Sequence, residues 1–414
     1  MLSQYYDALL ERFVRYVKID TQSDPESSTY PSTAKQLDLL RLLRDECQEL
    51  GLSNVDLDEH GYVTATLPSN VGYETKTVGF IAHVDTSPEV SGANVKPIIH
   101  KNYQGQDIVL PEREDIVIRF KDNPELAEQI GNDIVTASGN TLLGADNKSG
   151  VAAIMTAISY LLDHPEIKHG DIRIGFTPDE EIGGGTEYFD IKKFNCYCAY
   201  TVDSSTRGML DTETFSADAM TITFEGLNTH PGHAYHQMIN AIKLMADFVN
   251  RLPKEGLSPE TTKDRDGFVH PIDVKAGVDV SSIQFILRDF DAEKLVDQKN
   301  LLIKLANETV EAYPGSKFRY EHKVQYRNMS SVLEKYPDVT ANAERAIRDA
   351  GMEVRKMAVR GGTDGSQLSL HGLPTPNIFA GEQNYHSRYE WVSVQDMLKS
   401  AEVIVRLSAI WAEK

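Results

Sequence analysis

A histidine and an aspartate, His83 and Asp85, stand at the end of an apolar run that begins at Val78. Such a run predicts a buried strand, on which residues two apart point to the same face. The carboxylate of Asp85 can then accept a proton from one imidazole nitrogen of His83 and leave the other nitrogen to bind a cation. The pair alone is a weak indication of a metal site, because a strand end with a single hydrogen bond would look the same.

Further segments deliver acidic or histidine side chains beside apolar runs, and each comes from a different loop. The candidate ligands in these loops are Asp146, Glu181, Asp203 and His386. In an α/β sheet, the loops at the carboxyl ends of the strands meet at one edge, so we expect these side chains to converge with His83. The segments therefore strengthen the metal interpretation of the first pair.

The elements that must position these side chains alternate along the chain. Helical patterns alternate with apolar strands up to about residue 211, which predicts an α/β fold with a mostly parallel sheet covered on both faces. A helix is expected to begin at Thr33, with Gln36 as its capping-box partner. Later segments are expected as strand 219–224, helix 238–252, strand 283–290, helix 292–313, strand 318–326, helix 339–350, strand 353–359 and helix 392–411.

Composition limits the class of protein. The chain has 414 residues, a formal net charge of -20 and no cluster of Lys and Arg, so we expect no nucleic-acid partner. Three cysteines, Cys47, Cys196 and Cys198, cannot form a disulfide framework and indicate a reducing compartment. An amphipathic N-terminal segment and the lack of an apolar run of about 18 residues predict neither a signal peptide nor a membrane span. We therefore expect a cytoplasmic protein.

Taken in order, the segments resemble the M20 family of dinuclear zinc peptidases, and within it the aminotripeptidases. The marks of this resemblance are I-A-H-V-D-T, L-L-G-A-D-N-K-S-G, F-T-P-D-E-E-I-G, N-T-H-P-G, R-D-F-D, R-G-G-T-D-G and N-Y-H-S-R-Y-E, which span residues 81 to 390. The resemblance implies a zinc-peptidase catalytic domain interrupted by a smaller α+β, ferredoxin-like lid domain. We expect the catalytic domain at 1–213 and 329–414, and the lid at 214–328.

The resemblance also implies two Zn²⁺ ions per chain. Asp146 would bridge the two ions, His83 and Asp203 would complete one site, and Glu181 and His386 would complete the other. Imidazole and carboxylate ligands suit zinc and would also accept Co²⁺ or Mn²⁺.

The same resemblance assigns three residues to catalysis, namely Asp85, Glu180 and His230. Glu180 lies beside a ligand without needing to be one, so it can act as the general base. His230 would reach the active site from the lid and stabilise the oxyanion of the tetrahedral intermediate.

Three further residues are expected to bind substrate. Arg288 and Arg360 match positions at which the family binds a substrate carboxylate, a task that suits the planar guanidinium group. Asn240 would add a hydrogen bond. The expected substrates are small peptides, mainly tripeptides, and the sequence leaves the assembly open between a monomer and a homodimer.

Several residues depart from the family pattern. Asn147 replaces a second aspartate, Ser204 and Ser205 replace glycines, and the segment 235–237 differs from the small and basic residues expected there. His233 and His236 have no counterpart and are expected at the surface. None of these departures removes a ligand, so they bear on substrate preference more than on metal binding.

The leading hypothesis is a dizinc aminopeptidase that removes the N-terminal residue of tripeptides. Other M20 hydrolases, namely a dipeptidase, an aminoacylase or a carboxypeptidase, are the nearest alternatives, although the segment 102–108 resembles one found in the aminotripeptidases. A noncatalytic relative that binds metal or peptide is an alternative from another class, but no ligand or base is missing. A serine or cysteine hydrolase is disfavoured, because no G-x-S-x-G motif occurs.

Overall fold

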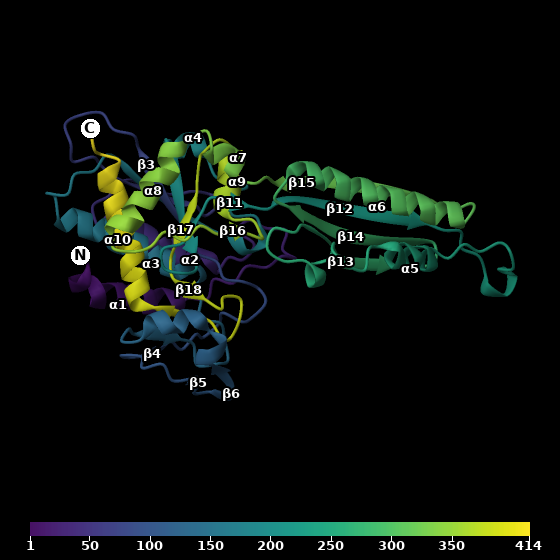
Figure 1. Cartoon of the computed structure of the whole chain (residues 1–414), viewed down its shortest axis with the longest axis horizontal. Coiled ribbons are helices and arrows are strands. Elements are labelled where there is room, and N and C mark those ends of the chain that lie inside the picture. The colour runs from purple at the N-terminus through teal and green to yellow at the C-terminus, as the bar shows by residue number, and fades with distance from the viewer. The chain divides into compact units, whose positions relative to one another are not determined.

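The computed structural model describes residues 1–414, and the chain divides into two compact units (Figure 1). Unit 1 comprises Met1–Thr212, Ser331–Met357 and Thr363–Lys414. Unit 2 comprises Glu213–Ser330 and a short return segment, Ala358–Gly362.

The return segment differs from the expected division, which gave residues 358–362 to the first domain. The expected strand at 353–359 is also wrong, because only β16 (Ala358–Val359) is a strand. β16 pairs in parallel with β11 (Glu213–Thr214), and this pairing joins the segment to unit 2. A two-residue strand followed by two glycines has no periodicity that a sequence pattern could reveal.

The main sheet of unit 1 has seven strands in the order β1-β2-β8-β3-β9-β17-β10. The four inner strands β8, β3, β9 and β17 are parallel, and antiparallel strands flank them. The bounds are β1 Ser53–Leu57, β2 Val63–Leu67, β8 Ile172–Thr177, β3 Val78–His83, β9 Cys198–Ser204, β17 Asn377–Phe379 and β10 Leu210–Asp211. Every residue of β3 is buried, as expected for a parallel strand covered on both faces. The predicted α/β class is confirmed.

Helices cover both faces of this sheet. Phe80 stacks on Tyr200, whose hydroxyl donates to the carbonyl of Val339 in α8 (Pro337–Asp349). The next residue, Ile81, points to the opposite face and packs with Phe194 and Leu368 of α4 (Ile191–Phe194) and α9 (Asp364–Leu370). The remaining helices are α1 (Tyr6–Val17), α3 (Ala145–Asp163) and α10 (Val394–Ile410), which pack on one another, and α2 (Gln36–Glu49), which packs on β1 and β2.

The helix expected to begin at Thr33 begins three residues later, at Gln36, and has no capping box. The Gln36 side chain does reach the Thr33 hydroxyl, at 3.2 Å. It also donates to the carboxylate of Asp179, at 2.6 Å. Gln36 therefore joins the start of α2 to a distant turn, a contact that local sequence patterns cannot show.

A smaller part of unit 1 was not predicted. It contains a four-stranded sheet, β18-β19-β7-β4, and a hairpin of β5 and β6. The bounds are β4 Ile98–His100, β5 Ile108–Leu110, β6 Arg113–Ile118, β7 Ile134–Thr136, β18 Glu382–Gln383 and β19 Trp391–Ser393. Most of these strands have only two or three residues, which is too short for a recognisable alternation.

Unit 2 is built on a four-stranded antiparallel sheet in the order β13-β14-β12-β15. Its elements run β12 Ser216–Glu225, α5 Ala241–Arg251, β13 Phe268–Ala276, β14 Val280–Asp289, α6 Ala292–Ala312 and β15 Lys317–Tyr326. This βαββαβ order and the strand order are those of the expected ferredoxin-like layer. Strand β13 was missed because Pro271 interrupts its run, and it lies at the sheet edge, where proline is tolerated.

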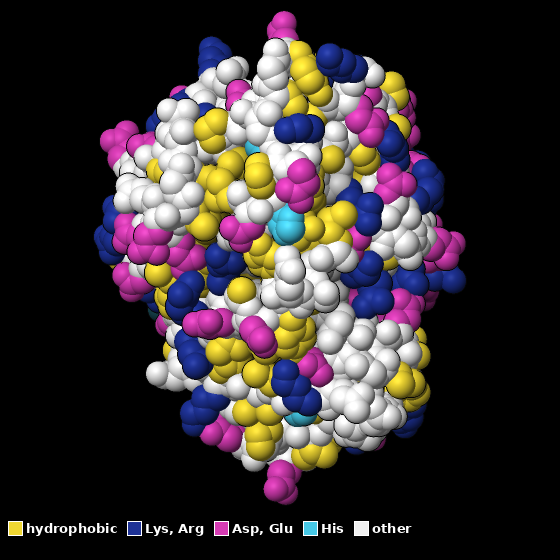
Figure 2. Space-filling view, turned by 90° about the vertical axis from the view of Figure 1, so that its left-hand side faces the viewer, with side chains coloured by type: hydrophobic (Ala, Val, Ile, Leu, Met, Phe, Trp, Pro, Cys, Tyr) yellow, Lys and Arg dark blue, Asp and Glu magenta, His cyan; other side chains and the backbone are white.

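The short helices complete the structure: η1 Ser3–Tyr5, η2 Phe120–Asp122, η3 Pro124–Gln129, η4 Glu180–Ile182, η5 Pro231–His233, η6 Pro259–Thr261 and α7 Ser330–Leu333. None of the helices combines the length and apolar character of a membrane span. On the face shown in Figure 2, acidic side chains are interspersed with Lys and Arg, and hydrophobic side chains lie between them.

Candidate metal centre

Two groups of ligand-type side chains meet in unit 1 and share Asp146. One group is His83, Asp146 and Asp203, and the other is Asp146, Glu181 and His386. Within each group the ligand atoms all lie within 4.8 Å of one another. The structure thus brings together all five side chains that the sequence marked as candidate ligands.

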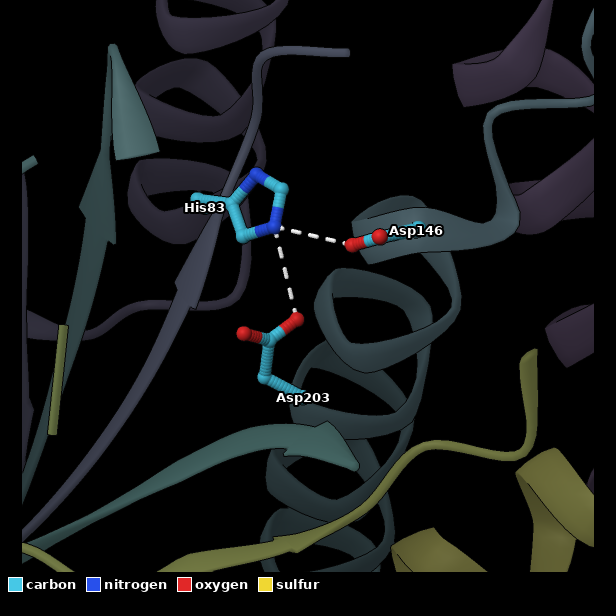
Figure 3. Close-up of side chains that lie close together, drawn as sticks. All are labelled: His83, Asp146 and Asp203. Carbon is cyan, nitrogen blue, oxygen red and sulfur yellow. Dashed lines mark hydrogen bonds and ion pairs between the residues drawn. The ribbon is translucent and has the colours of Figure 1, made fainter. Parts of the chain in front are cut away.

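The distances place Asp146 between two histidines. Nε2 of His83 lies 3.0 Å from Oδ1 of Asp146 and 3.3 Å from Oδ1 of Asp203 (Figure 3). Nε2 of His386 lies 3.3 Å from Oδ2 of Asp146 and 2.7 Å from Oε2 of Glu181. Each oxygen of the Asp146 carboxylate therefore faces a different histidine, which is the arrangement that a carboxylate bridging two cations requires.

The main sheet explains why these residues meet. His83 is the last residue of β3, Asp203 lies near the end of β9, and Glu181 lies in η4 just after β8, so all three come from the carboxyl ends of parallel strands. Asp146 lies at the start of α3, in backbone that is not yet helical. A Cβ at Gly150 would lie 2.0 Å from the carbonyl oxygen of Val202, so glycine at this position lets α3 approach β9 closely.

The donor set fits divalent cations. Oε1 of Glu181 and Oδ1 of Asp203 are buried and accept no hydrogen bond, so their lone pairs are available to a cation. Burial, reinforced by Asp146, raises the pKa of Glu181 to about 8, and burial raises the pKa of Asp203 to about 6. Clustered carboxylates of this kind are stabilised in the ionised form by a bound dication. Two imidazoles and three carboxylates match the ligand preferences of zinc and of related transition metals.

Asp85 is completely buried and contacts residues of both ligand groups. Nδ1 of His83 lies 3.1 Å from the carbonyl oxygen of Asp85 and 3.3 Å from its Oδ1, so the imidazole contacts the backbone of Asp85 as well as the carboxylate that the sequence pattern predicts. The Asp85 carboxylate also accepts the backbone N–H groups of Glu180, at 3.0 Å, and Glu181, at 3.2 Å. One side chain therefore orients a histidine of one group and the turn that carries a ligand of the other. The hydrogen bonds that join Asp85 to this turn connect residues about 95 positions apart, so no local sequence pattern indicates them.

Glu180 has no hydrogen bond to its carboxylate and lies beside the ligands. Burial raises the pKa of this carboxyl well above its usual value, and the nearby Asp203 and Asp364 raise it further, against the opposing effect of His83. A carboxyl group with a raised pKa near a cation site can both accept and return a proton.

The turn that carries Glu180 is fixed by Asp179, which has a positive φ of 59°. The Asp179 carboxylate accepts from the backbone N–H of Ser32 at 2.6 Å and from Gln36 at 2.6 Å. In return, the backbone N–H of Asp179 donates to the Gln36 side chain at 3.1 Å. Ser32 and Gln36 are supporting residues that the sequence did not identify as such.

The loop that carries Asp146 is held by Glu390, which is also buried. One carboxylate oxygen accepts the N–H groups of Leu143 at 2.7 Å and Gly144 at 2.8 Å, and the other accepts the N–H of Asp146 at 3.0 Å. Glu390 ends the N-Y-H-S-R-Y-E segment that contains His386, but no role could be given to it from sequence. The only indication in the sequence was that Glu390 is an acidic residue four positions after the candidate ligand His386.

The residues that depart from the family pattern lie outside both ligand groups. Asn147 is buried, and its side-chain oxygen accepts the N–H of Gly150 at 3.2 Å, inside α3. Ser204 is the last residue of β9, and its carbonyl accepts the N–H of Ala380 at 2.7 Å. His233 and His236 are exposed and belong to neither ligand group.

Four other candidate residues belong to unit 2. His230 is exposed, and its Nδ1 accepts the N–H of Gly232 at 3.1 Å. The Asn240 side chain accepts the N–H of Ile242 at 2.9 Å, so it caps α5. This cap is a structural role that the sequence analysis did not assign to Asn240.

The two candidate arginines of unit 2 form no ion pair with a carboxylate. Arg288 donates to the carbonyls of Leu287 at 2.9 Å and Asp218 at 3.3 Å. Arg360 donates to the Thr262 hydroxyl at 3.1 Å, and its guanidinium lies 5.3 Å from the centre of the Phe215 ring. Each guanidinium group is held by neutral partners and keeps its charge available to an anion.

The chain is similar to known proteins over most of its length. The model of the family described as Peptidase family M20/M25/M40 matches residues 139–409. A protein named Peptidase T from Geobacillus thermodenitrificans is 47% identical over 406 residues, which cover 98% of each chain.

Two solved structures share the fold. A tripeptidase from Staphylococcus aureus superposes with a TM-score of 0.77 at 20% identity and covers 99% of both chains. A dinuclear metal-binding M20 peptidase from Bacillus subtilis superposes with a TM-score of 0.67 at 13% identity, also over 99% of both chains.

Proposed function

The chain belongs to the peptidase family M20/M25/M40, and we propose that it is a metallo-aminopeptidase that removes the N-terminal residue from tripeptides. The observation that carries this proposal is the pair of ligand groups that share Asp146, with the unpartnered carboxylate of Glu180 beside them. The relative named Peptidase T, which is similar over almost the whole chain, supports the choice of an aminopeptidase within the family.

The proposed cofactor is two Zn²⁺ ions, for which Co²⁺ or Mn²⁺ could substitute. His83 and Asp203 would hold one ion, Glu181 and His386 the other, and Asp146 would bridge them. Bound cations of this kind polarise the scissile carbonyl and lower the pKa of water. The protein supplies the fixed geometry, through Asp85 on one side and Glu390 on the other.

Glu180 is proposed as the general base. It would take a proton from the attacking water and pass it to the leaving amine, a role that suits a carboxyl whose pKa is raised by burial. Asp85 would not touch the substrate but would hold the Glu180 turn in place through its two backbone hydrogen bonds.

Unit 1 is proposed as the catalytic domain and unit 2 as the lid domain. From unit 2, His230 would donate to the oxyanion that forms on the scissile carbonyl. Arg288 and Arg360 would bind the C-terminal carboxylate of the peptide, because neither is neutralised within the chain. Asn240 is proposed to add a hydrogen bond to the substrate, besides its role as the cap of α5.

A cytoplasmic location is part of the proposal. The cysteines Cys47, Cys196 and Cys198 are all free, which fits a reducing compartment. Fractionation of cells that express the tagged chain at its natural level would test this location.

A panel of free-acid peptides tests the substrate class. If the arginines bind the terminal carboxylate while the site holds the first peptide carbonyl, the length between them is fixed, because an extended residue spans about 3.3 to 3.6 Å. We expect Leu-Gly-Gly to be cleaved with a higher kcat/KM than Leu-Gly or Leu-Gly-Gly-Gly. Preferred cleavage of dipeptides, of N-acylated amino acids or at the C-terminus would instead identify another M20 activity.

Amidation of the tripeptide sharpens this test. The amide should lose about ten- to a hundredfold in kcat/KM, because a charge-assisted hydrogen bond is removed. The loss should be much smaller in Arg288→Ala, where the partner is already gone. Arg319→Ala is the matched control, because this exposed arginine of the same unit pairs with Glu225 instead. Equal rates on the acid and the amide in the unmodified protein would contradict the proposed clamp.

A further inference from the structure

A cavity of about 530 Å³ in unit 1 adjoins the candidate metal centre. Ser205 and Thr206, which line it, follow Asp203 by two and three residues, and Tyr385, which also lines it, directly precedes His386. Two walls of the cavity are therefore the loops that carry one ligand of each group.

Part of the cavity lining is apolar and adaptable. Met209, Met357 and Tyr385 contribute to its lining. Met209 is fixed at its sulfur, which accepts from the backbone N–H of Thr206 at 3.2 Å and from the Ser205 hydroxyl at 3.4 Å. The Met357 side chain is 57% exposed and free to adjust. Unbranched methionine side chains adapt to ligands of different shape, so this wall suits a long aliphatic chain.

The two charged residues that line the cavity, Arg355 and Glu125, differ in whether they have a partner of opposite charge. Arg355 forms an ion pair with Glu128, so its charge is compensated within the chain. Glu125, which is half-buried in the wall, forms no ion pair, and its carboxylate makes no hydrogen bond. The lining therefore presents one uncompensated negative charge beyond its apolar wall.

We propose that this cavity receives the side chain of the substrate's N-terminal residue, and that Glu125 favours a long side chain ending in a positive charge. The inference rests on the proposed aminopeptidase function. In the proposed reaction the scissile carbonyl belongs to the first residue of the peptide, so the side chain of that residue is attached beside the carbonyl that the metal centre would hold. The cavity, whose walls continue the ligand loops of unit 1, is accordingly assigned to this side chain. Glu125 is a specificity-determining residue, not a catalytic one.

Two tripeptides of nearly equal size test this assignment, Lys-Gly-Gly and norleucyl-Gly-Gly. Their first side chains share a four-carbon stem and differ in the terminal ammonium group. In Glu125→Gln the ratio of kcat/KM for lysine over norleucine should fall by a factor of about 2 to 5, because a partly solvated ion pair is lost. In the unmodified protein the same ratio should fall as salt is raised, since salt screens a partly exposed charge.

Glu114→Gln is the matched control, because this glutamate of β6 is exposed and lies outside the cavity. It should leave the ratio as it is. Glu125→Lys provides a second variant, in which the preference should turn from Lys-Gly-Gly towards Glu-Gly-Gly.

The outcomes separate the inference from the function on which it rests. An unchanged ratio in Glu125→Gln overturns the inference while the aminopeptidase stands. An equal loss on both tripeptides also overturns it, because Glu125 would then bind the α-ammonium group that the two substrates share. Failure of the unmodified protein to cleave any tripeptide overturns the proposed function, and this inference with it.

Discussion

At the scale of single residues, the site contains two kinds of side chain. Some can bind a cation directly, and others fix the positions of those ligands through hydrogen bonds. His83, Asp146 and their partners direct ligand-type atoms at one another, and Oε1 of Glu181 and Oδ1 of Asp203 accept no hydrogen bond. The carboxylate oxygens of Asp85 and Glu390 instead accept hydrogen bonds from backbone N–H groups of the ligand loops. Removing a supporting residue should therefore disturb a ligand's position, whereas removing a ligand should remove the cation.

Glu180 should separate proton transfer from metal binding. We expect Glu180→Gln to keep its metal and to lose a factor of about 10² to 10⁴ in kcat, because the amide cannot accept the proton. Glu181→Gln is the comparison, since the neighbouring side chain is a candidate ligand, and it should lose metal as well as rate. The measurements are steady-state kinetics and elemental analysis of the same samples. Near-normal turnover in Glu180→Gln would rule it out as the base.

The ligand residues could be predicted from sequence because their types and positions after apolar runs are local features. Their supporting contacts could not be predicted. Gln36 contacts Asp179 across 143 residues, and Glu390 contacts Asp146 across 244 residues. Nothing in the residue types distinguishes a buried carboxylate that accepts backbone N–H groups from one that binds a cation.

At the scale of elements, the loop before α3 depends on Glu390. Its two oxygens accept three backbone N–H groups in the segment Leu143–Asp146. A glutamine would keep one acceptor oxygen and turn an N–H₂ group towards backbone donors. We expect Glu390→Gln to lower the free energy of unfolding by about 1 to 3 kcal/mol, because buried donors lose their partner.

Urea unfolding would measure this change, and metal content should fall with it because Asp146 is no longer held. Glu26→Gln is the control, since this glutamate is exposed on a surface loop. A variant as stable as the control, with full metal content, would show that the loop holds its shape without Glu390.

The elements themselves were predictable to different degrees. The continuous apolar run of β3 and the long apolar segments of the helices α3 and α10 are visible in the sequence directly. β13 was hidden by Pro271, and the strands of the small sheet are too short to show a pattern. The start of α2 was misplaced because the Thr33 and Gln36 pair looks like a capping box, whereas the Gln36 side chain also contacts Asp179.

At the scale of the whole molecule, each unit supplies a different part of the proposed chemistry. Unit 1 holds both ligand groups and the cavity beside them, and unit 2 holds the two arginines without acidic partners. The return segment Ala358–Gly362 places Arg360 in unit 2 with Arg288, although the two are far apart in sequence. This grouping could not be read from sequence, because it depends on the pairing of β16 with β11.

The central claim is that Asp146 is shared between two cations that the activity requires. Metal content measured by elemental analysis on the fully active protein, in parallel with tripeptide hydrolysis, tests it most directly. The account predicts about two ions of zinc or a related metal per chain, because the two ligand groups share one carboxylate. Chelation should abolish hydrolysis, and Asp146→Ala should lose both ions together with the activity. Fully active protein that consistently contains one ion or none, or an Asp146→Ala variant that keeps two ions, would contradict the account.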